Sequence, residues 1–419
     1  MLKLPGGFGG SGKRYIVGFD LSDSYCALSY CCDKGDIRTV SLVMGSEEYS
    51  IPMALSKRHG AGQWFFGNEA YTSADAGESI LVEDIYTKAL AGEDTQIDGL
   101  VYGAVSLLTL YLKRCFGLLQ SVGSFDRMDA VMFTLPEVST NSISVIRKSL
   151  EGLHIKTDRI FFMAHSESFF RYVINEPGDM IRKNPLLFTV EDKGLSLVKL
   201  NINRFTTPKV VHAEKTRFDL PRDRSTLPDE LDNTLLRASQ GVSEKIADYS
   251  FYLVGEDFSE DILRNSLKYM CSKGRVYGGI NLFSRGAVYA LLDREGKSDY
   301  VFLGDDKLSN NIGMKLLSQG AEVYYALLDA GICWYDAESF VEFYVQGTNV
   351  ITLSAESIKE NHKSDVVITL EGYEGNLTRM RLTVSMKDTS VLRVVIEDLG
   401  LGAFTGTKAN KWEEEIALP

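Results

Sequence analysis

The residues best placed for chemistry lie at the end of the first predicted strand. Asp20 follows the apolar residues 16–19, and the small polar residues Ser22, Asp23 and Ser24 separate it from a second alternating run. This pattern predicts a β-hairpin. Backbone N–H groups in such a turn can receive a phosphate, and a neighbouring carboxylate can hold a hydrated Mg²⁺ against it. The hairpin therefore predicts a phosphate site with Asp20 as its acid.

Glu167 is a second acid in a suitable setting. It follows the predicted strand 160–163 and lies at the start of a predicted helix, directly after His165 and Ser166. Its carboxylate can hold Mg²⁺ through water. A helix start capped by Ser166 explains the same residues without a ligand, and both interpretations stay open.

Two turns later in the chain supply the remaining candidates. Asp192 and Gly194 lie in the turn of a second predicted hairpin, residues 186–203, where backbone amides can surround a phosphate. Gly255 and Glu256 follow the predicted strand 252–254, and a glycine there lets a phosphate or a base approach closely. A glycine that only permits a tight turn explains Gly255 equally well.

The composition indicates a multi-domain protein that binds neither nucleic acid nor membrane. The 419 residues exceed what one hydrophobic core usually serves, and 44% of them are hydrophobic. The net charge of −12 disfavours nucleic acid and anionic membranes, which bind clustered Lys and Arg. The 6 cysteines match neither a zinc spacing nor a disulfide framework. We expect reduced thiols and a cytoplasmic location.

The order of the predicted elements indicates parallel strands with crossover helices. A Gly-rich flexible tail, residues 1–13, has neither the apolar stretch of a signal peptide nor the context of a phosphate-binding P-loop. Ser259 is the expected N-cap of the last helix of this part. The strands are predicted at 37–43, 48–54, 130–135, 160–163, 208–214 and 250–254, with a strand that turns into a short polar segment at 64–71. The helices are predicted at 97–122, 140–153, 231–249 and 259–271.

These motifs, in this order, resemble the superfamily of actin, sugar kinases and heat-shock-chaperone ATPases over residues 14–293. YIVGFDLSDS resembles the first phosphate loop, LLFTVEDKGLSLVKL stands where the second belongs, and FYLVGEDF stands where the adenosine loop belongs. The resemblance implies a two-lobed actin-like ATPase fold built from duplicated ribonuclease-H-like β-sheets. It also implies a vestigial nucleotide site with Asp20, Glu167 and Asp192 as candidate acids and, around them, Ser22, Asp23, Ser24, Gly194, Gly255 and Glu256.

Three departures from the superfamily weaken the expected activity. Val190 stands at the acid position of the second loop, and Glu191 to Gly194 replace its glycines, although Asp192 can compensate in part. Gly255 and Glu256 stand where two glycines are expected. About fifty residues separate the second hairpin from Tyr252, too few for a separate adenine-clamping subdomain. Efficient ATP hydrolysis is not expected, because catalysis needs preorganised donors at every developing charge.

The composition of the chain changes after a charged linker at 294–300. Short alternating segments from Val301 onward predict an antiparallel β-sandwich. Residues 366–400 resemble the peptide-binding β-sandwich of the heat-shock chaperones, and an unrelated accessory β-sandwich stays open as the alternative. The predicted domains are therefore a tail at 1–13, an actin-like domain at 14–298 and a β-sandwich at 299–419.

The sequence predicts a catalytically degenerate, chaperone-like ATPase-fold protein that binds a protein or peptide partner as a scaffold. No cofactor is expected. The alternative is a slow chaperone-like ATPase switch that uses Mg·ATP, with Asp20 holding Mg²⁺ through water. Sugar or acetate kinase activity is a third hypothesis, which lacks an identifiable base for the phosphoryl acceptor. The two-part organisation also resembles a bacterial protein family.

Overall fold

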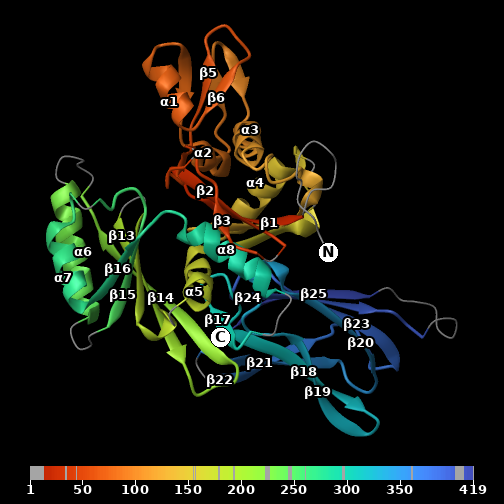
Figure 1. Ribbon diagram of the computed structural model, residues 1–419. Coiled ribbons are helices and arrows are strands. Elements are labelled where there is room, and N and C mark those ends of the chain that lie inside the picture. Colours follow the sequence, from red (N-terminus) through yellow and green to blue (C-terminus); the bar gives the residue numbers. More distant parts are fainter. Residues whose placement is uncertain are drawn as a thin grey trace. The chain divides into compact units, whose positions relative to one another are not determined.

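The chain is a mixed α/β protein that divides into two compact units (Figure 1). The first unit comprises Met1–Ile202 and Ala213–Ser298, and the second comprises Asn203–His212 and Asp299–Pro419. The computed structural model describes residues 14–33, 35–43, 45–153, 155, 157–177, 180–191, 194–221, 227–243, 248–259, 261–294, 298–359, 362–401 and 410–418. The predicted tail at 1–13 and the candidate Asp192 lie outside these residues.

The first sheet of the first unit contains the predicted hairpin. Its strand order is β11-β10-β1-β2-β3, with β4 beside β2. β1 and β2 are antiparallel, and the Ser22 N–H donates to the Tyr25 carbonyl at 3.0 Å across the polar turn. β10 and β11 continue the sheet in parallel with β1. The strands are β1 (Tyr15–Leu21), β2 (Tyr25–Cys32), β3 (Arg38–Thr39), β4 (Ile51–Pro52), β10 (Met128–Leu135) and β11 (Ile160–Ala164).

Helices cover both faces of this sheet. On one face α3 (Ala104–Gly117) and α4 (Thr140–Glu151) bury an aromatic core, in which the Phe19 ring lies 4.9 Å from Phe133 and 5.4 Å from Phe116. On the other face α8 (Leu282–Asp293) approaches β1 closely. A Cβ atom at Gly18 would lie 2.0 Å from the Ser284 carbonyl oxygen, so only glycine allows this approach.

A smaller group of elements is inserted between β4 and α3. It contains a three-stranded sheet in the order β6-β5-β7 and a separate β8-β9 hairpin. The Lys57 ammonium pairs with Asp98 at the tip of that hairpin at 2.9 Å. The elements are β5 (Leu55–Arg58), β6 (Trp64–Phe66), α1 (Asn68–Asp75), β7 (Ser79–Val82), α2 (Ile85–Ala91), β8 (Thr95–Ile97) and β9 (Leu100–Tyr102).

The second sheet repeats the arrangement of the first. Its order is β16-β15-β12-β13-β14-β17. β12 and β13 are an antiparallel hairpin, and β15 and β16 follow in parallel with β12, as β10 and β11 follow β1. The strands are β12 (Pro185–Glu191), β13 (Gly194–Asn203), β14 (Lys209–Asp219), β15 (Tyr249–Val254), β16 (Gly274–Gly278) and β17 (Tyr300–Leu303).

Helices α6 (Leu227–Ser243) and α7 (Arg264–Lys273) pack on one face of the second sheet over buried Phe188 and Phe251. Helix α5 (His165–Asn175) contributes Phe169 to the other face, where its ring lies 5.3 Å from that of Tyr252.

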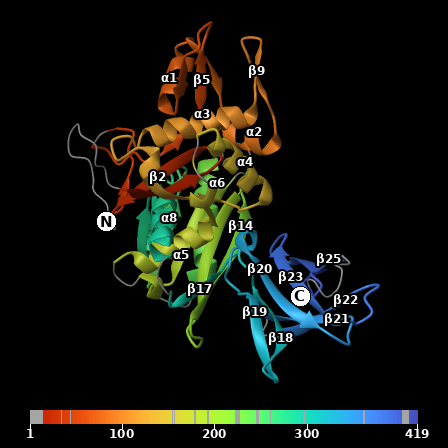
Figure 2. The same cartoon turned by 90° about the vertical axis from the view of Figure 1, so that its right-hand side faces the viewer.

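Helices α5 and α8 pack directly against each other (Figure 2). A Cβ atom at Gly286 would lie 2.1 Å from the Ser168 carbonyl oxygen. The Ser168 hydroxyl donates to the Phe283 carbonyl at 2.6 Å. Since α8 covers the first sheet and α5 the second, this close contact joins the two halves of the unit.

The second unit is dominated by two four-stranded antiparallel sheets, in the orders β19-β18-β21-β22 and β20-β23-β24-β25. Alternate residues are buried, with Leu353, Leu382 and Leu392 fully inaccessible. The strands are β18 (Asn310–Ser318), β19 (Ala321–Leu328), β20 (Glu338–Val345), β21 (Val350–Ser357), β22 (His362–Thr369), β23 (Thr378–Met386), β24 (Val391–Asp398) and β25 (Lys411–Ala417).

Several predicted elements of the first unit are wrong in length. The strands expected at 37–43 and 48–54 shrink to the two-residue β3 and β4. The helix expected at 97–122 begins only at Ala104, because Asp98 and Gly99 adopt φ of 51° and 78° and turn the preceding residues into the β8-β9 hairpin. Within the part of the chain that the structure describes, no helix is long and apolar enough to cross a membrane.

The helix expected at 259–271 is α7, which begins at Arg264, and Ser259 is not its N-cap. The carboxylate of Asp232 on α6 instead accepts the Asn265 and Ser266 backbone N–H groups at 3.0 and 2.8 Å. A side chain from another helix therefore caps α7. The helix expected at 231–249 is α6, which begins earlier and ends at Ser243.

Candidate functional site

Asp20 lies at the carboxyl end of β1 and is completely buried. Its Oδ1 lies 2.8 Å from Nε2 of His165, the first residue of α5. The His165 ring stacks on Phe283 of α8, with centroids 3.9 Å apart and planes within 8°. The predicted metal-organising acid is thus part of the contact between β1, α5 and α8.

Burial raises the pKa of the Asp20 carboxyl, and the attraction of His165 only partly opposes this effect. Within the described residues the second oxygen, Oδ2, has no hydrogen-bond partner. The same holds for the buried hydroxyl of Thr134, which is paired with Asp20 on the adjacent parallel strand. One face of this sheet end therefore holds two unsatisfied oxygen atoms, a costly arrangement in a protein interior.

The polar turn beside Asp20 is surrounded by acids. Burial raises the pKa of Tyr25, and the carboxylate of Asp20 raises it further. A hydrogen bond with Ser22 lowers this pKa, and the carboxylates of Glu256 and Asp257 raise it again by smaller amounts. The structure therefore brings the candidates Asp20 and Glu256 to the same tyrosine. A phosphate placed there meets several negative charges.

Asp23 and Ser24 complete the turn between β1 and β2. The Asp23 carboxylate accepts a hydrogen bond from Thr87 of α2 at 3.1 Å. The Ser24 carbonyl accepts the Met53 N–H at 2.8 Å. Both contacts attach the turn to neighbouring segments of the chain.

The last described residues before the turn of the second hairpin are Thr189, Val190 and Glu191 at the end of β12. Asp20 is the last β1 residue that pairs with the parallel strand β10. Thr189 is the last β12 residue that pairs with the parallel strand β15. Thr189, and not Val190, is therefore the counterpart of Asp20 in the second sheet. The carboxylate of Glu191 is bound by Lys215 at 2.8 Å and Arg217 at 3.3 Å. The Glu191 carboxylate is therefore already paired with two cations.

Gly194 and Gly255 have structural explanations. A Cβ atom at Gly194 would lie 2.4 Å from the Phe218 carbonyl of β14, so close packing of the backbone requires glycine. Gly255 has φ of 136°, a conformation that side chains rarely adopt, in the turn after β15. Glu256 next to it accepts a hydrogen bond from the Ser50 hydroxyl. Both glycines are accounted for without a ligand.

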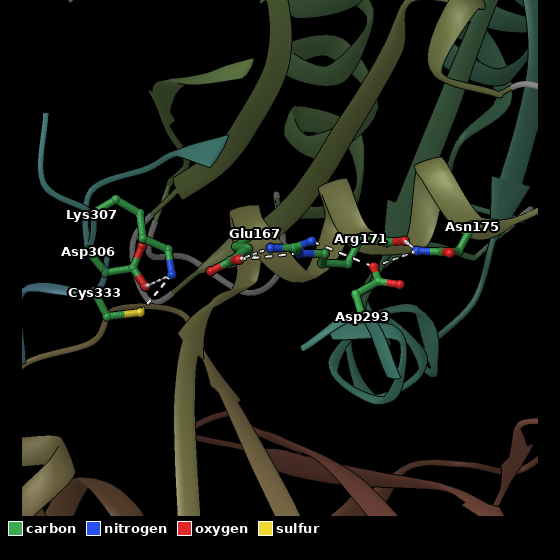
Figure 3. A network of polar contacts seen from close by, with 7 residues as sticks. All are labelled: Glu167, Arg171, Asn175, Asp293, Asp306, Lys307 and Cys333. Carbon is green, nitrogen blue, oxygen red and sulfur yellow. Dashed lines mark hydrogen bonds and ion pairs between the residues drawn. The ribbon is translucent and has the colours of Figure 1, made fainter. Parts of the chain in front are cut away.

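Glu167 lies in the first turn of α5, is buried, and pairs with Arg171 at 3.1 Å (Figure 3). Arg171 also reaches Asp293 of α8 at 3.6 Å, and Asn175 donates to the same carboxylate at 3.2 Å. This network joins α5 to α8. Ser166 is not the N-cap, because the helix begins one residue before it and its N-cap is Ala164.

The second unit contributes a separate polar group to Figure 3. The Lys307 ammonium donates to Cys333 Sγ at 2.7 Å and lies 3.8 Å from Asp306. Nothing in the sequence pattern pointed to this pair.

The described candidates fit Mg²⁺-bound phosphate poorly. A hydrated Mg²⁺ keeps several waters and uses accessible carboxylates, whereas Asp20 is inaccessible and Glu191 is paired with two cations. Among the described residues, no group of three or more His, Cys, Asp or Glu side chains has the arrangement of a metal site. The geometry is that of a packed junction.

A family model for the C-terminal part of the family of unknown function DUF5716 matches residues 36–305, and the chain belongs to that family. A second model, for the domain of unknown function DUF8552, matches residues 307–418. The two matches meet close to the division between the structural units after Ser298. No curated protein matches the chain.

Proposed function

We propose that this DUF5716 protein is a catalytically degenerate member of the actin-like ATPase fold that binds a protein or peptide partner as a scaffold. The repeated sheet order supports the fold. Each six-stranded sheet contains an antiparallel hairpin, a further strand beside it and two parallel strands on the other side. The resemblance to duplicated ribonuclease-H-like sheets leads us to expect such a repeat, and the α5-α8 pair joins the two halves.

The observation that carries the proposal is the position of Asp20. Its carboxylate is buried and bonded to His165, and the His165 ring is fixed against Phe283. An acid that organises Mg²⁺ must face water and the nucleotide. This acid instead faces the start of a helix, where it contributes to packing.

A binding role follows from what the frame retains. Two sheets and their helices remain while the acid of the second loop is replaced by Thr189 and the first loop is surrounded by carboxylates. The antiparallel second unit offers sheet edges, which bind extended peptides in many proteins. The spacing of the six cysteines matches no disulfide framework, which supports a cytoplasmic location.

The proposal is tested with Mg·ATP and Mg·ADP in thermal-shift and calorimetric titrations. A nucleotide present below its Kd adds less than about 0.4 kcal/mol of stability, which moves the melting temperature of a protein of this size by roughly 1 °C. We expect no larger shift at millimolar nucleotide. The matched variants are Asp20→Asn and Asp75→Asn, since Asp75 is an exposed acid on α1. A shift of several degrees that disappears only in Asp20→Asn contradicts the proposal.

One observation favours the slow ATPase switch as a second candidate. Asp20 Oδ2 and the Thr134 hydroxyl are buried without partners among the described residues. A carboxylate with one unsatisfied oxygen is a position at which function rather than stability can explain the residue. Nucleotide-dependent stabilisation that requires Asp20 supports this candidate.

A further inference from the structure

The two sheets of the second unit have four edge strands, and three of them carry charges near their centres. The edges are β19, β20, β22 and β25. Charged residues on an edge discourage pairing with another strand. These residues are Glu338 and Glu342 on β20, Lys363 and Asp365 on β22, and Glu413, Glu414 and Glu415 on β25.

The fourth edge, β19, lacks this protection. Its single charge is Glu322, near its beginning, and residues 323–328 are uncharged. Within the described residues, β19 pairs with β18 and with no strand on its other side. Its side chains are exposed despite their apolar character, with 48% of Val323, 47% of Tyr324 and 43% of Tyr325 accessible. Leu327 and Leu328 at the end of β19 are buried and β20 contacts this strand, whereas residues 321–326 are exposed. That part of the edge is open to a further strand.

One face of β19 is apolar. Val323 and Tyr325 pair with Leu316 and Met314 of β18, and Met314 is buried. Because side chains alternate between the faces of a strand, Val323 and Tyr325 extend the buried side of the sheet to its edge. An added strand would place every second side chain against this surface.

The opposite face combines an aromatic ring with carboxylates. The Tyr324 ring covers Gly313 of β18, where a Cβ atom would lie 2.4 Å from the ring. Glu322 lies two residues away on the same face and pairs with Lys315 of β18 at 3.2 Å. Glu356 of β21 pairs with Asn311, on the same face as Gly313, and with Lys363 of β22. Burial raises the pKa of Tyr324, and the carboxylates of Glu356 and Asp329 raise it further, which agrees with an acidic surrounding.

The charge of the second unit identifies the kind of partner. Residues 301–419 contain 10 Lys and Arg but 18 Asp and Glu, a net charge of −8 out of −12 for the whole chain. A second copy of the chain would bring the same negative charge to the edge. A basic partner is attracted instead, and its cations can also stack on the Tyr324 ring.

We infer that the free edge of β19 binds an extended peptide in which basic side chains alternate with apolar ones. The peptide adds as a fifth strand, its apolar side chains lie against Val323 and Tyr325, and its basic side chains lie beside Tyr324 and Glu322, whose carboxylate also pairs with Lys315. This inference rests on the proposed scaffold function and assigns its binding surface and the chemistry of its partner.

The test uses the full chain and a fluorescein-labelled peptide of about ten residues, the length of a long strand, in which Lys alternates with Val. Fluorescence anisotropy measures binding at low and physiological salt. A matched peptide with Glu in place of Lys is the control. We expect the Lys peptide to bind, its affinity to fall with added salt, and the Glu peptide not to bind.

Two variants locate the site. Tyr324→Ala removes the ring and should raise the Kd at least about tenfold, as truncation of an aromatic anchor does. Glu322→Lys reverses an exposed charge and should raise the Kd by roughly fivefold. Glu414→Lys makes the same change of net charge on the edge strand β25 and should leave the Kd within about twofold. If Tyr324→Ala fails to fold in circular dichroism, Glu322→Lys and its control still decide.

Four results overturn the inference. The first is that the Lys peptide does not bind. The second is that it binds both β19 variants as tightly as the unchanged protein. The third is that Glu414→Lys weakens binding of the peptide as much as Glu322→Lys does. The fourth is a concentration-dependent dimer, lost in both β19 variants, which would assign the edge to a second copy. The nucleotide titration of Asp20 is independent of all four, so failure of the peptide site and failure of the degenerate-ATPase proposal are distinguished.

Discussion

Removal of the Asp232 carboxylate should destabilise the α6-α7 region of the second sheet. Asp232 is buried and accepts the backbone N–H groups of Asn265 and Ser266 together with the side-chain groups of both residues at 2.5 to 3.0 Å. Since the N-cap residue of α7, Leu263, makes no side-chain cap, Asp232 fulfils that role from a neighbouring helix.

The cost of Asp232→Ala has two parts. Loss of a cap costs about 1–2 kcal/mol. Ser266 is completely buried, so its groups are left without an acceptor at a further cost of about 1–2 kcal/mol. We expect a total loss of about 2–4 kcal/mol, in line with the larger effects of single substitutions. Asp229→Ala, an exposed acid in the first turn of the same helix, should cost less than about 0.5 kcal/mol.

The assay is hydrogen exchange of the α7 amides, supported by urea unfolding followed by circular dichroism. A loss of 2–4 kcal/mol corresponds to protection factors lower by roughly 30-fold to 1,000-fold. Burial acts to raise the pKa of Asp232, but the hydrogen bonds from Ser266 and Asn265 lower it overall.

The contribution of the Asp232 carboxylate to the free energy of unfolding is therefore present above its unfolded pKa of about 4, and it is lost as the pH falls through the lower folded pKa. The difference between Asp232→Ala and the unchanged protein should shrink over that range. Equal losses in Asp232→Ala and Asp229→Ala, or unchanged α7 protection, refute this explanation of the helix start.

Two further substitutions test the junction around Asp20. Asp20→Asn can keep the bond to His165 without a buried charge. Because burial raises the pKa of Asp20, the cost of ionising this carboxyl in the folded protein grows as the pH rises from about 4 through the folded pKa. Urea titrations should therefore show that the Asn variant is at least as stable at pH 7 and that its stability depends less on pH. Gly286→Ala should cost about 3 kcal/mol or more in thermal unfolding, because its Cβ meets the Ser168 backbone at 2.1 Å, whereas Gly241→Ala in α6 meets nothing within 4 Å and should gain about 0.5–1 kcal/mol.

The local features of the first sheet could be predicted because its signals are local. The apolar run, the polar turn and the alternating second run give β1 and β2, and the helix expected at 140–153 is α4, which ends at Glu151. The strand ended by Pro136 is β10. In each case the residues that specify the element lie within it or next to it.

The errors occur where distant residues determine the outcome. The apolar spacing at 97–102 fits a helix, but the Asp98-Gly99 turn favours a hairpin, which Lys57 stabilises from another strand. The start of α7 depends on Asp232, more than thirty residues earlier in the chain. The partner of Asp20 is His165, which reaches it only because β1, β10 and β11 are adjacent in the sheet. Spacing along the sequence contains no signal for such contacts.

The contact of Asp20 with His165 also sets a limit on nucleotide affinity. Its carboxylate links β1 to α5 directly and to α8 through the Phe283 ring. A Mg²⁺ ion that coordinates this carboxylate through Oδ1 must displace His165, and one that coordinates it through the unpartnered Oδ2 must still open the packing around a completely buried group. With a protonated His165, breaking the buried pair costs about 3–5 kcal/mol. Since 1.4 kcal/mol is a factor of ten in affinity, that cost weakens binding by roughly two to three and a half orders of magnitude. A site that would otherwise bind Mg·ATP with micromolar affinity then binds it at about millimolar concentration. For the proposed degenerate ATPase, this cost at the packed junction would by itself account for weak nucleotide binding.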